Sequence, residues 1–282
     1  MSANENARLA VVICTGSYHT PAPYEALMQA LQSSGFEAYC PLRPTCDLSK
    51  LHVGDVTHPD FDLGPPPEGY PTDLDDVQVV DEVLTKLIEQ EGKEVLLLAH
   101  SSGGTIASQA AVPRLQSKAR QANDQPGGVI GIFYVGAFVV PVGESVHTFF
   151  QPKEGPVVTP PFMQFHKHGV RGLGTIVEAH KYLFHDLPAD EAAKWTATLT
   201  ASPVNTGVLT NDAYSALPCA YLVLDNDQTL PPAYQEMMIA LQAEKGNTFT
   251  VYHAPSGHSP HLSWTGPLVS QVRAFINQCR RD

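Results

Sequence analysis

The chain has 282 residues, 43% of them hydrophobic and 16% charged, which suits one large α/β domain or two small ones. Its formal net charge at pH 7 is −12, and such an acidic chain is expected to avoid nucleic acid and anionic membranes. No apolar run approaches the roughly 20 residues that are needed to cross a bilayer, which excludes a membrane-spanning helix.

Short apolar runs alternate with amphipathic stretches along most of the chain. Consecutive Val, Leu and Ile are typical of strands buried on both faces of a parallel sheet, and apolar residues at helical spacing indicate helices. In chain order, the predicted strands cover residues 9–14, 36–40, 95–99, 129–135, 220–224 and 248–252. The predicted helices cover residues 24–33, 73–90, 102–112, 232–244 and 262–279. This alternation predicts an α/β fold with a doubly wound, mostly parallel sheet and right-handed crossovers.

The helix predicted at residue 73 has a clear start. Thr72 is the expected N-cap, and Asp73, Asp75 and Asp76 suit the positive end of the helix dipole. We therefore interpret these three acids as capping groups and not as catalysts.

Two regions interrupt the alternation. Residues 43–71 contain no predicted element, and a loop of this length is uncommon unless it is functional or disordered. Residues 144–213 follow the fourth strand and contain short helical patterns at 176–184 and 190–199. We expect this second region to be a helical lid over the carboxyl edge of the sheet. The expected organisation is a core in two parts with one insertion: residues 1–143, 144–213 and 214–282.

The segment Ala99-His100-Ser101-Ser102-Gly103 joins a predicted strand to a predicted helix. A nucleophile elbow needs this order, because its serine occupies a strained turn with the hydroxyl exposed. Small residues two positions before and after the serine, here Ala99 and Gly103, let the strand and the helix pass closely. The following helix also aims N–H groups at developing negative charge. The segment predicts Ser101 as a nucleophile, the alternative being an ordinary strand-to-helix turn.

Acid and histidine candidates follow in the chain order serine, acid, histidine that is typical of such sites. Asp225 and Asp227 lie directly after a late strand, and either one also suits the cap of the next helix. His258 lies on a Gly- and Pro-rich loop after the last strand, whereas His253 lies within that strand and His261 is expected to begin the last helix. We therefore predict His258 as the base, with Asp225 and Asp227 as alternative acids.

The chemistry requires all three groups and an oxyanion hole. A serine hydroxyl is a poor nucleophile until a base accepts its proton, and the acid orients that base. Two backbone N–H groups must stabilise the oxyanion, each lowering the barrier by roughly 3 kcal/mol. One is expected from Ser102 and the other from the loop after the first strand, residues 14–19.

Several of these segments together resemble the α/β-hydrolase superfamily, and within it the compact branch of plant methylesterases and hydroxynitrile lyases. Residues 99–103 are similar to the Gly-His-Ser-x-Gly elbow of that branch. Residues 133–141 are similar to its strand and the Ala-Phe-x-Pro turn that leads into the lid. Residues 9–16 are similar to its opening strand, with Thr15-Gly16 in place of the family's His-Gly pair. The resemblance extends over most of the chain and is weakest in the long loop and the lid.

The resemblance implies roles for particular residues. Asp227 lies just upstream of Leu230-Pro231, as the family's acid does before an Ile-Pro pair, and Gly257-His258 is similar to the segment of its histidine. This favours Asp227 over Asp225. The resemblance also implies the N–H of Ser17 as the second oxyanion donor. Hydroxynitrile lyases use a lysine in the acid loop, and this loop has none, which counts against cyanohydrin cleavage.

The leading hypothesis is a serine hydrolase that cleaves a carboxylic ester or lactone of a small apolar molecule through an acyl-enzyme on Ser101. The apolar preference rests on side chains of the lid that are suited either to line a pocket or to pack against the core: Phe149, Phe150, Phe162, Met163, Phe165, Leu173, Ile176 and Tyr182. Two alternatives stay open. One uses His258 as a base for C–C cleavage, cyclisation or elimination, and the other is a catalytically retired binding protein.

We expect neither a cofactor nor a metal. His166 and His168 form a chelating pair by composition, but no carboxylate or cysteine stands nearby at ligand spacing. The five cysteines are scattered without CxxC spacing, and the N-terminus does not resemble a signal peptide, which favours a cytoplasmic protein with reduced thiols. The expected partner is a small-molecule substrate, and a homodimer is left open.

Overall fold

The computed structural model describes residues 9–281, and a six-stranded sheet forms its centre. The paired strands all run parallel, in the order β2-β1-β3-β4-β8-β9. Their bounds are Leu9–Cys14 (β1), Glu37–Tyr39 (β2), Glu94–His100 (β3), Gly128–Val135 (β4), Cys219–Leu224 (β8) and Phe249–Ala254 (β9). β1, β4 and β8 are buried along their whole length, as runs of Val, Leu and Ile require. The predicted α/β fold with a mostly parallel sheet is confirmed.

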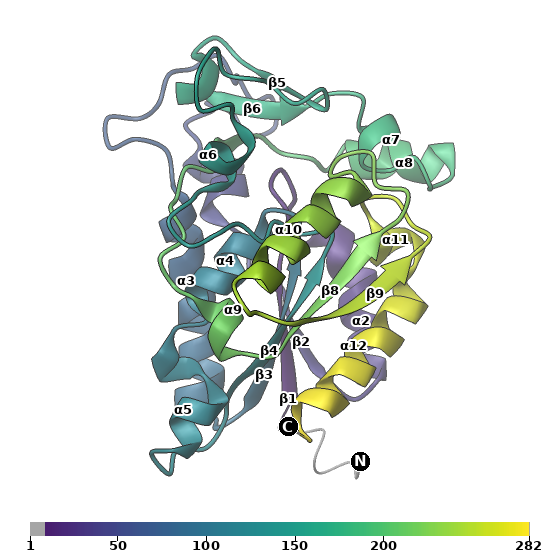
Figure 1. Ribbon diagram of the computed structural model, residues 1–282. Helices are drawn as coiled ribbons and strands as arrows, with labels where there is room; N and C mark the ends of the chain where they lie inside the picture. The colour runs from purple at the N-terminus through teal and green to yellow at the C-terminus, as the bar shows by residue number, and fades with distance from the viewer. Residues whose placement is uncertain (1–8, 282) are drawn as a thin grey trace.

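Helices cover both faces of the sheet (Figure 1). On one face, α2 (Glu25–Ser33) and α12 (Thr265–Cys279) pack on Ile13 of β1 and on its neighbours. On the other face, the helices pack on the side chains that alternate with these, including Val12. Those helices are α3 (Asp73–Thr85), α4 (Gly103–Ala110) and α10 (Pro232–Glu244).

The remaining helical pieces of the core are short. A π-helical turn, Lys86–Gln90, continues α3, and Trp264 separates α11 from α12. The other pieces are α5 (Ser117–Gln121), α9 (Ala213–Ala216) and α11 (Pro260–Ser263), with 3-10 turns at Ala22–Tyr24, Pro44–Cys46, Leu48–Lys50 and Pro113–Leu115.

The chain between β4 and β8 lies largely beyond the carboxyl ends of the strands (Figure 1). Three strands in it pair antiparallel in the order β5-β6-β7. The elements are α6 (Val146–Phe150), β5 (Met163–Phe165), a 3-10 turn (Gly169–Arg171), β6 (Leu173–Ile176), α7 (Ala179–Tyr182), α8 (Ala189–Thr196) and β7 (Ser202–Pro203). The helix predicted at 176–184 is present only as α7, because β6 extends to Ile176 and Glu178, with a φ of 48°, breaks the helical path before Ala179.

The long loop of residues 43–71 is packed against this inserted segment. Its Leu51 and Val53 form a small buried cluster with Leu173 of β6 and with Ala201. The loop therefore joins the core of the molecule to the segment above the sheet.

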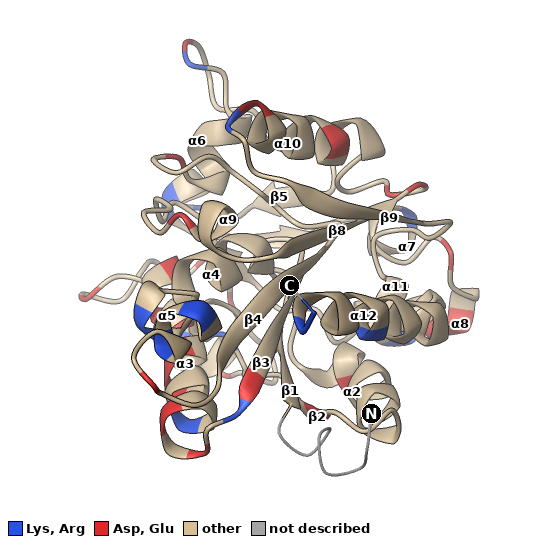
Figure 2. Cartoon of the chain, turned by 60° about the horizontal axis from the view of Figure 1, so that its bottom comes forward, with Lys and Arg blue, Asp and Glu red and all other residues tan. Residues whose placement is uncertain are grey.

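Charged residues lie mainly on helices and loops around the sheet (Figure 2). Those on strands lie near the strand starts, where Glu37 accepts a hydrogen bond from Lys93 Nζ (2.7 Å) and Glu94 accepts one from Arg280 Nε (2.7 Å). Over residues 9–281, no helix combines the length and the apolar character that a membrane span requires.

Candidate active site

The turn from β3 to α4 has the geometry of a nucleophile elbow. Ser101 has a φ of 54°, in the left-handed region that non-glycine residues rarely adopt. Its carbonyl accepts hydrogen bonds from the N–H groups of Gly104 (3.1 Å) and Phe138 (2.9 Å), which hold the turn. A side chain on Gly103 would overlap the carbonyl of Cys14, so β1 can approach the elbow only because residue 103 is glycine.

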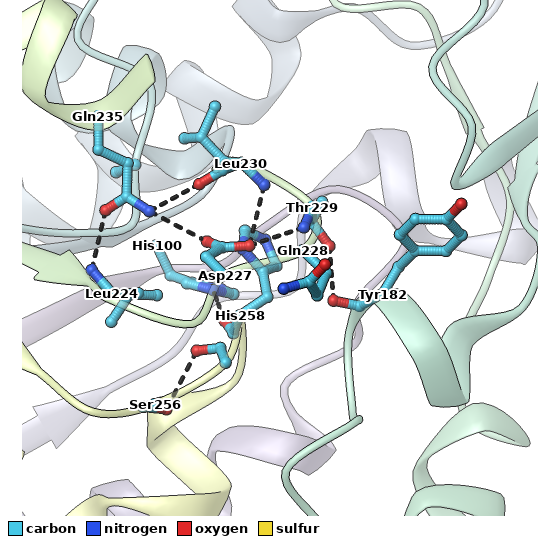
Figure 3. Close-up of polar contacts among 12 residues, drawn as sticks. His100, Tyr182, Leu224, Asp227, Gln228, Thr229, Leu230, Gln235, Ser256 and His258 are labelled. Carbon is cyan, nitrogen blue, oxygen red and sulfur yellow. Dashed lines mark hydrogen bonds and ion pairs between the residues drawn. The ribbon is translucent and has the colours of Figure 1, made fainter. Parts of the chain in front are cut away.

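Asp227 and His258 form a buried pair. The His258 Nδ1–H donates to Asp227 Oδ2 across 2.7 Å, and the two side chains are 2% and 0% exposed. The proton lies on Nδ1 because an ionised carboxylate can only accept. Asp227 Oδ1 accepts two further hydrogen bonds, from the N–H groups of Thr229 (2.8 Å) and Leu230 (2.9 Å) (Figure 3). These donors stabilise the negative charge of the carboxylate.

Gln235 on α10 supports the same carboxylate and was not predicted from the sequence. Its side chain is fully buried, and its Nε2 donates to Asp227 Oδ2 (3.3 Å) and to the carbonyl of Leu230 (2.7 Å) (Figure 3). Its Oε1 accepts from the N–H of Leu224 (3.0 Å) at the end of β8. One amide therefore ties the acid loop to the strand that precedes it.

The two candidate acids lie in different surroundings. Asp225 pairs with His253 (Oδ1 to Nδ1, 2.8 Å), and both side chains are about half exposed on the surface. Asp227 instead lies beneath the cavity wall with His258. The structure thus brings Asp227, and not Asp225, to the predicted base.

A buried relay that the sequence did not predict fixes the backbone of His258. The Gly16 N–H donates to Tyr24 Oη (3.2 Å), which lies 2.7 Å from His100 Nδ1, and His100 Nε2 lies 2.7 Å from the carbonyl of His258. Since that carbonyl can only accept, His100 carries its proton on Nε2 and accepts from Tyr24. Burial holds the pKa of His100 well below its usual range, so the ring stays neutral.

His261 lies behind the site. Its ring stacks on Tyr24 with centroids 4.2 Å apart, and neither ring nitrogen has a hydrogen-bond partner among the described residues. Burial holds its pKa well below the usual range. This environment suits packing and does not suit a base that exchanges protons.

The two predicted oxyanion donors lie side by side. Ser17 Oγ and Ser102 Oγ are 2.8 Å apart, so the loop after β1 contacts the residue that follows Ser101. Within residues 9–281, no protein acceptor takes a hydrogen bond from the N–H of Ser17 or of Ser102. Both N–H groups are therefore available to a bound ligand.

A cavity of about 420 Å³ brings these residues together, since Ser17, Ser101, Ser102 and His258 all line it. Its other walls are mostly apolar and come largely from the inserted segment. Of the eight side chains predicted for a pocket, five line the cavity: Phe150, Phe162, Met163, Phe165 and Ile176.

The other three pack elsewhere. Leu173 belongs to the cluster with the long loop, Phe149 packs against the main core, and the Tyr182 carbonyl accepts a hydrogen bond from Thr229 Oγ1 (2.8 Å). Each of them carries the same apolar or aromatic signal in sequence, so composition could not separate them from the cavity residues.

One capping prediction needs correction. Thr72 and Asp75 form the expected capping box of α3, but Asp76 forms a buried ion pair with Arg43 (Oδ2 to Nη2, 2.8 Å) from the long loop. Asp73 accepts a hydrogen bond from the N–H of Gly207 (2.7 Å). Both acids have tertiary partners that lie far away in sequence, which local helix signals cannot reveal.

The two histidines considered as a chelating pair, His166 and His168, lie close to other hydrogen-bonding partners. His166 Nε2 lies 2.9 Å from Thr175 Oγ1, and His168 Nε2 lies 3.2 Å from the carbonyl of Asp62. Across the described part of the chain, no group of three or more His, Cys, Asp or Glu side chains is arranged to hold a metal ion.

Comparison with known proteins gives a consistent assignment. The model of the alpha/beta hydrolase family matches residues 11–270. The Aspergillus novofumigatus protein described as alpha/beta hydrolase nvfD is 27% identical over 273 residues, which cover 94% of this chain and 95% of that protein. The crystal structure of a pyrethroid hydrolase from Sphingobium faniae JZ-2 has a TM-score of 0.69 at 20% identity, covering 95% of this chain and 98% of that one. Polyneuridine aldehyde esterase has a TM-score of 0.65 at 13% identity, covering 94% of this chain and 99% of that one. The resemblance predicted from the sequence motifs is confirmed, and the chain belongs to the alpha/beta hydrolase family.

Proposed function

We propose that this enzyme hydrolyses a carboxylic ester or lactone of a small apolar molecule through an acyl-enzyme on Ser101. The observation that carries the proposal is the meeting of four features in one cavity. Ser101 lies on a strained elbow, His258 is bonded to a buried Asp227, two backbone N–H groups are unoccupied, and the walls are apolar. Each feature has a defined part in acyl transfer.

The proposed reaction starts from the Asp227–His258 hydrogen bond and from the cavity that Ser101 and His258 share. Because His258 gives its Nδ1–H to Asp227, its Nε2 can accept the proton of Ser101 as the hydroxyl oxygen attacks the carbonyl carbon. The electron pair of the C=O bond then becomes an oxyanion, which the N–H groups of Ser17 and Ser102 stabilise. The oxyanion then re-forms the C=O bond, the bond between the acyl carbon and the alcohol oxygen breaks, and His258 gives its proton to that oxygen, which leaves the acyl group on Ser101. A water molecule releases the acid by the same steps in reverse.

The cavity sets the expected substrate class. Its volume of about 420 Å³ lies within the range of pockets for small organic ligands, roughly 300–1,000 Å³. We propose that the inserted segment acts as a lid, because it supplies most of the apolar wall. The names of two similar structures support a hydrolytic reaction, since one is a pyrethroid hydrolase and the other, polyneuridine aldehyde esterase, is named for ester cleavage.

Covalent labelling tests the proposal. Incubation with a fluorophosphonate should label Ser101, identified by peptide mass spectrometry, and wild-type protein should hydrolyse short-chain aryl esters. Ser101→Ala should abolish labelling and lower turnover by about 10⁶-fold. Ser270→Ala, at an exposed serine of α12, serves as the control and should behave as wild type.

The outcomes separate the alternatives. Appreciable turnover by Ser101→Ala would rule out the acyl-enzyme and favour His258 as a base for C–C cleavage, cyclisation or elimination. Absence of both labelling and turnover in the wild type would favour a binding protein.

A further inference from the structure

A chain of polar side chains lies directly behind the two oxyanion N–H groups. It begins at the buried pair of Asp76 and Arg43, the latter only 1% exposed. Arg43 Nη1 donates to Ser102 Oγ (2.8 Å), Ser102 Oγ lies 2.8 Å from Ser17 Oγ, and Asn205 Nδ2 donates to Ser17 Oγ (3.1 Å). The chain therefore ends at Ser17, which lines the cavity.

The direction of each hydrogen bond in this chain can be worked out. A guanidinium has no acceptor, so Ser102 Oγ must accept from Arg43. The side chain of Ser102 is buried, and Ser17 Oγ is the other partner that it has among the described residues. A buried hydroxyl that gives its proton to no acceptor costs about 1–3 kcal/mol, so Ser102 donates to Ser17.

This direction leaves one proton free. Asn205 places its Nδ2 toward Ser17, while its buried Oδ1 has no partner among the described residues. In this orientation Ser17 Oγ accepts from Ser102 and from Asn205, which fills both of its lone pairs. Its own O–H then has no acceptor within residues 9–281, and Ser17 is only half-buried at the cavity wall beside Ser101. A hydroxyl that lines a cavity and has both lone pairs occupied can donate its proton to a bound ligand.

We infer that the Ser17 hydroxyl is a third donor to the oxyanion, in addition to the N–H groups of Ser17 and Ser102. The inference rests on the proposed acyl-transfer function. Arg43 strengthens the donor, because hydrogen bonds in a chain polarise one another and the chain here begins at a fixed positive charge. Arg43 Nη1 also donates to the Thr15 carbonyl (2.8 Å), so the same residue positions the loop that carries Ser17.

The long loop thereby acquires a role. Arg43 is its first residue, and Asp76 neutralises the guanidinium while leaving Nη1 directed at the oxyanion loop and Ser102. Thr45 Oγ1 and the Thr45 N–H also donate to Asp76 (2.7 and 3.0 Å), which fixes the carboxylate. Arg43 acts through Ser102 and the oxyanion loop and is therefore a positioning residue, whereas Ser17 is the residue that contacts the reacting atoms.

The test compares two variants of Ser17. Ser17→Ala removes the hydroxyl and keeps the N–H, whereas Ser17→Thr keeps both groups. Ser17→Ala should lower kcat for aryl esters by about 10²-fold with little change in KM, and Ser17→Thr should retain most of the activity. Ser108→Ala, at a buried serine of α4 whose hydroxyl bonds to Gly104 and Tyr134 and not to the cavity, is the control and should retain wild-type kcat.

Two binding measurements distinguish an oxyanion donor from a merely structural hydroxyl. A trifluoromethyl ketone forms an oxyanion on Ser101, so its affinity should fall with Ser17→Ala by the same factor as kcat. An intact ester, measured in the Ser101→Ala background, should bind equally well with and without the Ser17 hydroxyl. An unchanged kcat in Ser17→Ala, or a loss that appears equally in ester binding, would overturn the inference.

A second variant covers the case in which Ser17→Ala does not fold. Ser102→Ala breaks the link to Arg43 and keeps the Ser102 N–H, so it should lower ketone affinity and kcat together by a smaller factor. Wild-type affinity for the ketone in that variant would overturn the polarised chain. An inactive wild type with no fluorophosphonate adduct would instead overturn the proposed function itself, which separates the two failures.

Discussion

Asp225 and Asp227 are separated by a single residue, yet their surroundings give them different roles. Asp225 pairs with an exposed histidine, whereas Asp227 is buried against His258 and holds it through Nδ1. Either residue suited the acid by position in the chain, and only the turn at Asp227-Gln228-Thr229 directs one of them inward. The N–H groups of Thr229 and Leu230 then bond to its carboxylate, which favours this turn.

This contrast gives a matched pair of variants. Asp227→Asn should lower kcat by about 10⁴-fold, because an amide stabilises the wrong tautomer of the imidazole and cannot balance an imidazolium. Asp225→Asn changes a carboxylate of the same loop on the surface and should leave kcat within twofold of wild type. Steady-state kinetics on an aryl ester measures both, and a larger loss for Asp225→Asn would assign the acid to the other residue.

At the scale of elements, the inserted segment is fastened to the loops that carry the acid and the base. Asp186, between α7 and α8, accepts hydrogen bonds at Oδ2 from the Gly257 N–H (2.8 Å), Ser256 Oγ (3.1 Å) and Ser263 Oγ (2.7 Å). Thr229 Oγ1 donates to the Tyr182 carbonyl on the same side (2.8 Å). The position of the inserted segment and the position of His258 are therefore coupled.

Removing the Asp186 carboxylate should affect both the position of His258 and the stability of the protein. Asp186→Ala leaves the N–H next to His258 without its acceptor, and we expect a loss of stability of about 1–3 kcal/mol together with a lower kcat. Asp190→Ala, at an exposed acid in the first turn of α8, removes a charge from the same region and should change neither quantity by more than the helix-dipole effect, about 0.5 kcal/mol. Urea unfolding and ester kinetics check both variants, and equal effects would contradict the coupling.

What the sequence could predict at this scale follows from the range of each interaction. Buried strands, the elbow and the order serine, acid, histidine depend on local patterns, and these patterns predict Ser101, His258 and two alternative acids, Asp225 and Asp227. The family resemblance then favours Asp227. The strands β5, β6 and β7 were missed because each has only two to four residues, too few for an alternating pattern. Arg43 and Tyr24 were missed because the side chains that they contact, Asp76 and Ser102 for Arg43 and His100 for Tyr24, lie 33 to 76 residues away in the chain.

Considered as a whole, the molecule buries a cluster of neutral imidazoles where distant parts of the chain meet. His19 comes from the loop after β1, His100 from β3 and His261 from α11, and their ring centroids are 5.0 to 6.3 Å apart. Burial lowers the pKa of His19 to about 4 and holds the pKa of His100 and of His261 well below the usual range. The unfolded chain has no such burial, so its imidazoles keep an ordinary pKa near 6.5.

This difference makes the fold sensitive to acid. Below about pH 6.5 the unfolded chain binds protons that the folded chain does not, so the free energy of unfolding falls as the pH drops from 6.5 towards 4. His261→Phe keeps the ring stacked on Tyr24 and removes one of the titrating groups. Between pH 7.5 and pH 5, wild-type protein should therefore lose about 2 kcal/mol more stability than this variant, from 1.4 kcal/mol per pH unit over the 1.5 units below pH 6.5. Urea titrations at the two pH values measure the difference.

His180→Gln, at an exposed histidine of α7, is the control and should follow the wild-type curve. Parallel curves for wild type and His261→Phe would instead show that His261 titrates alike in the folded and unfolded chains.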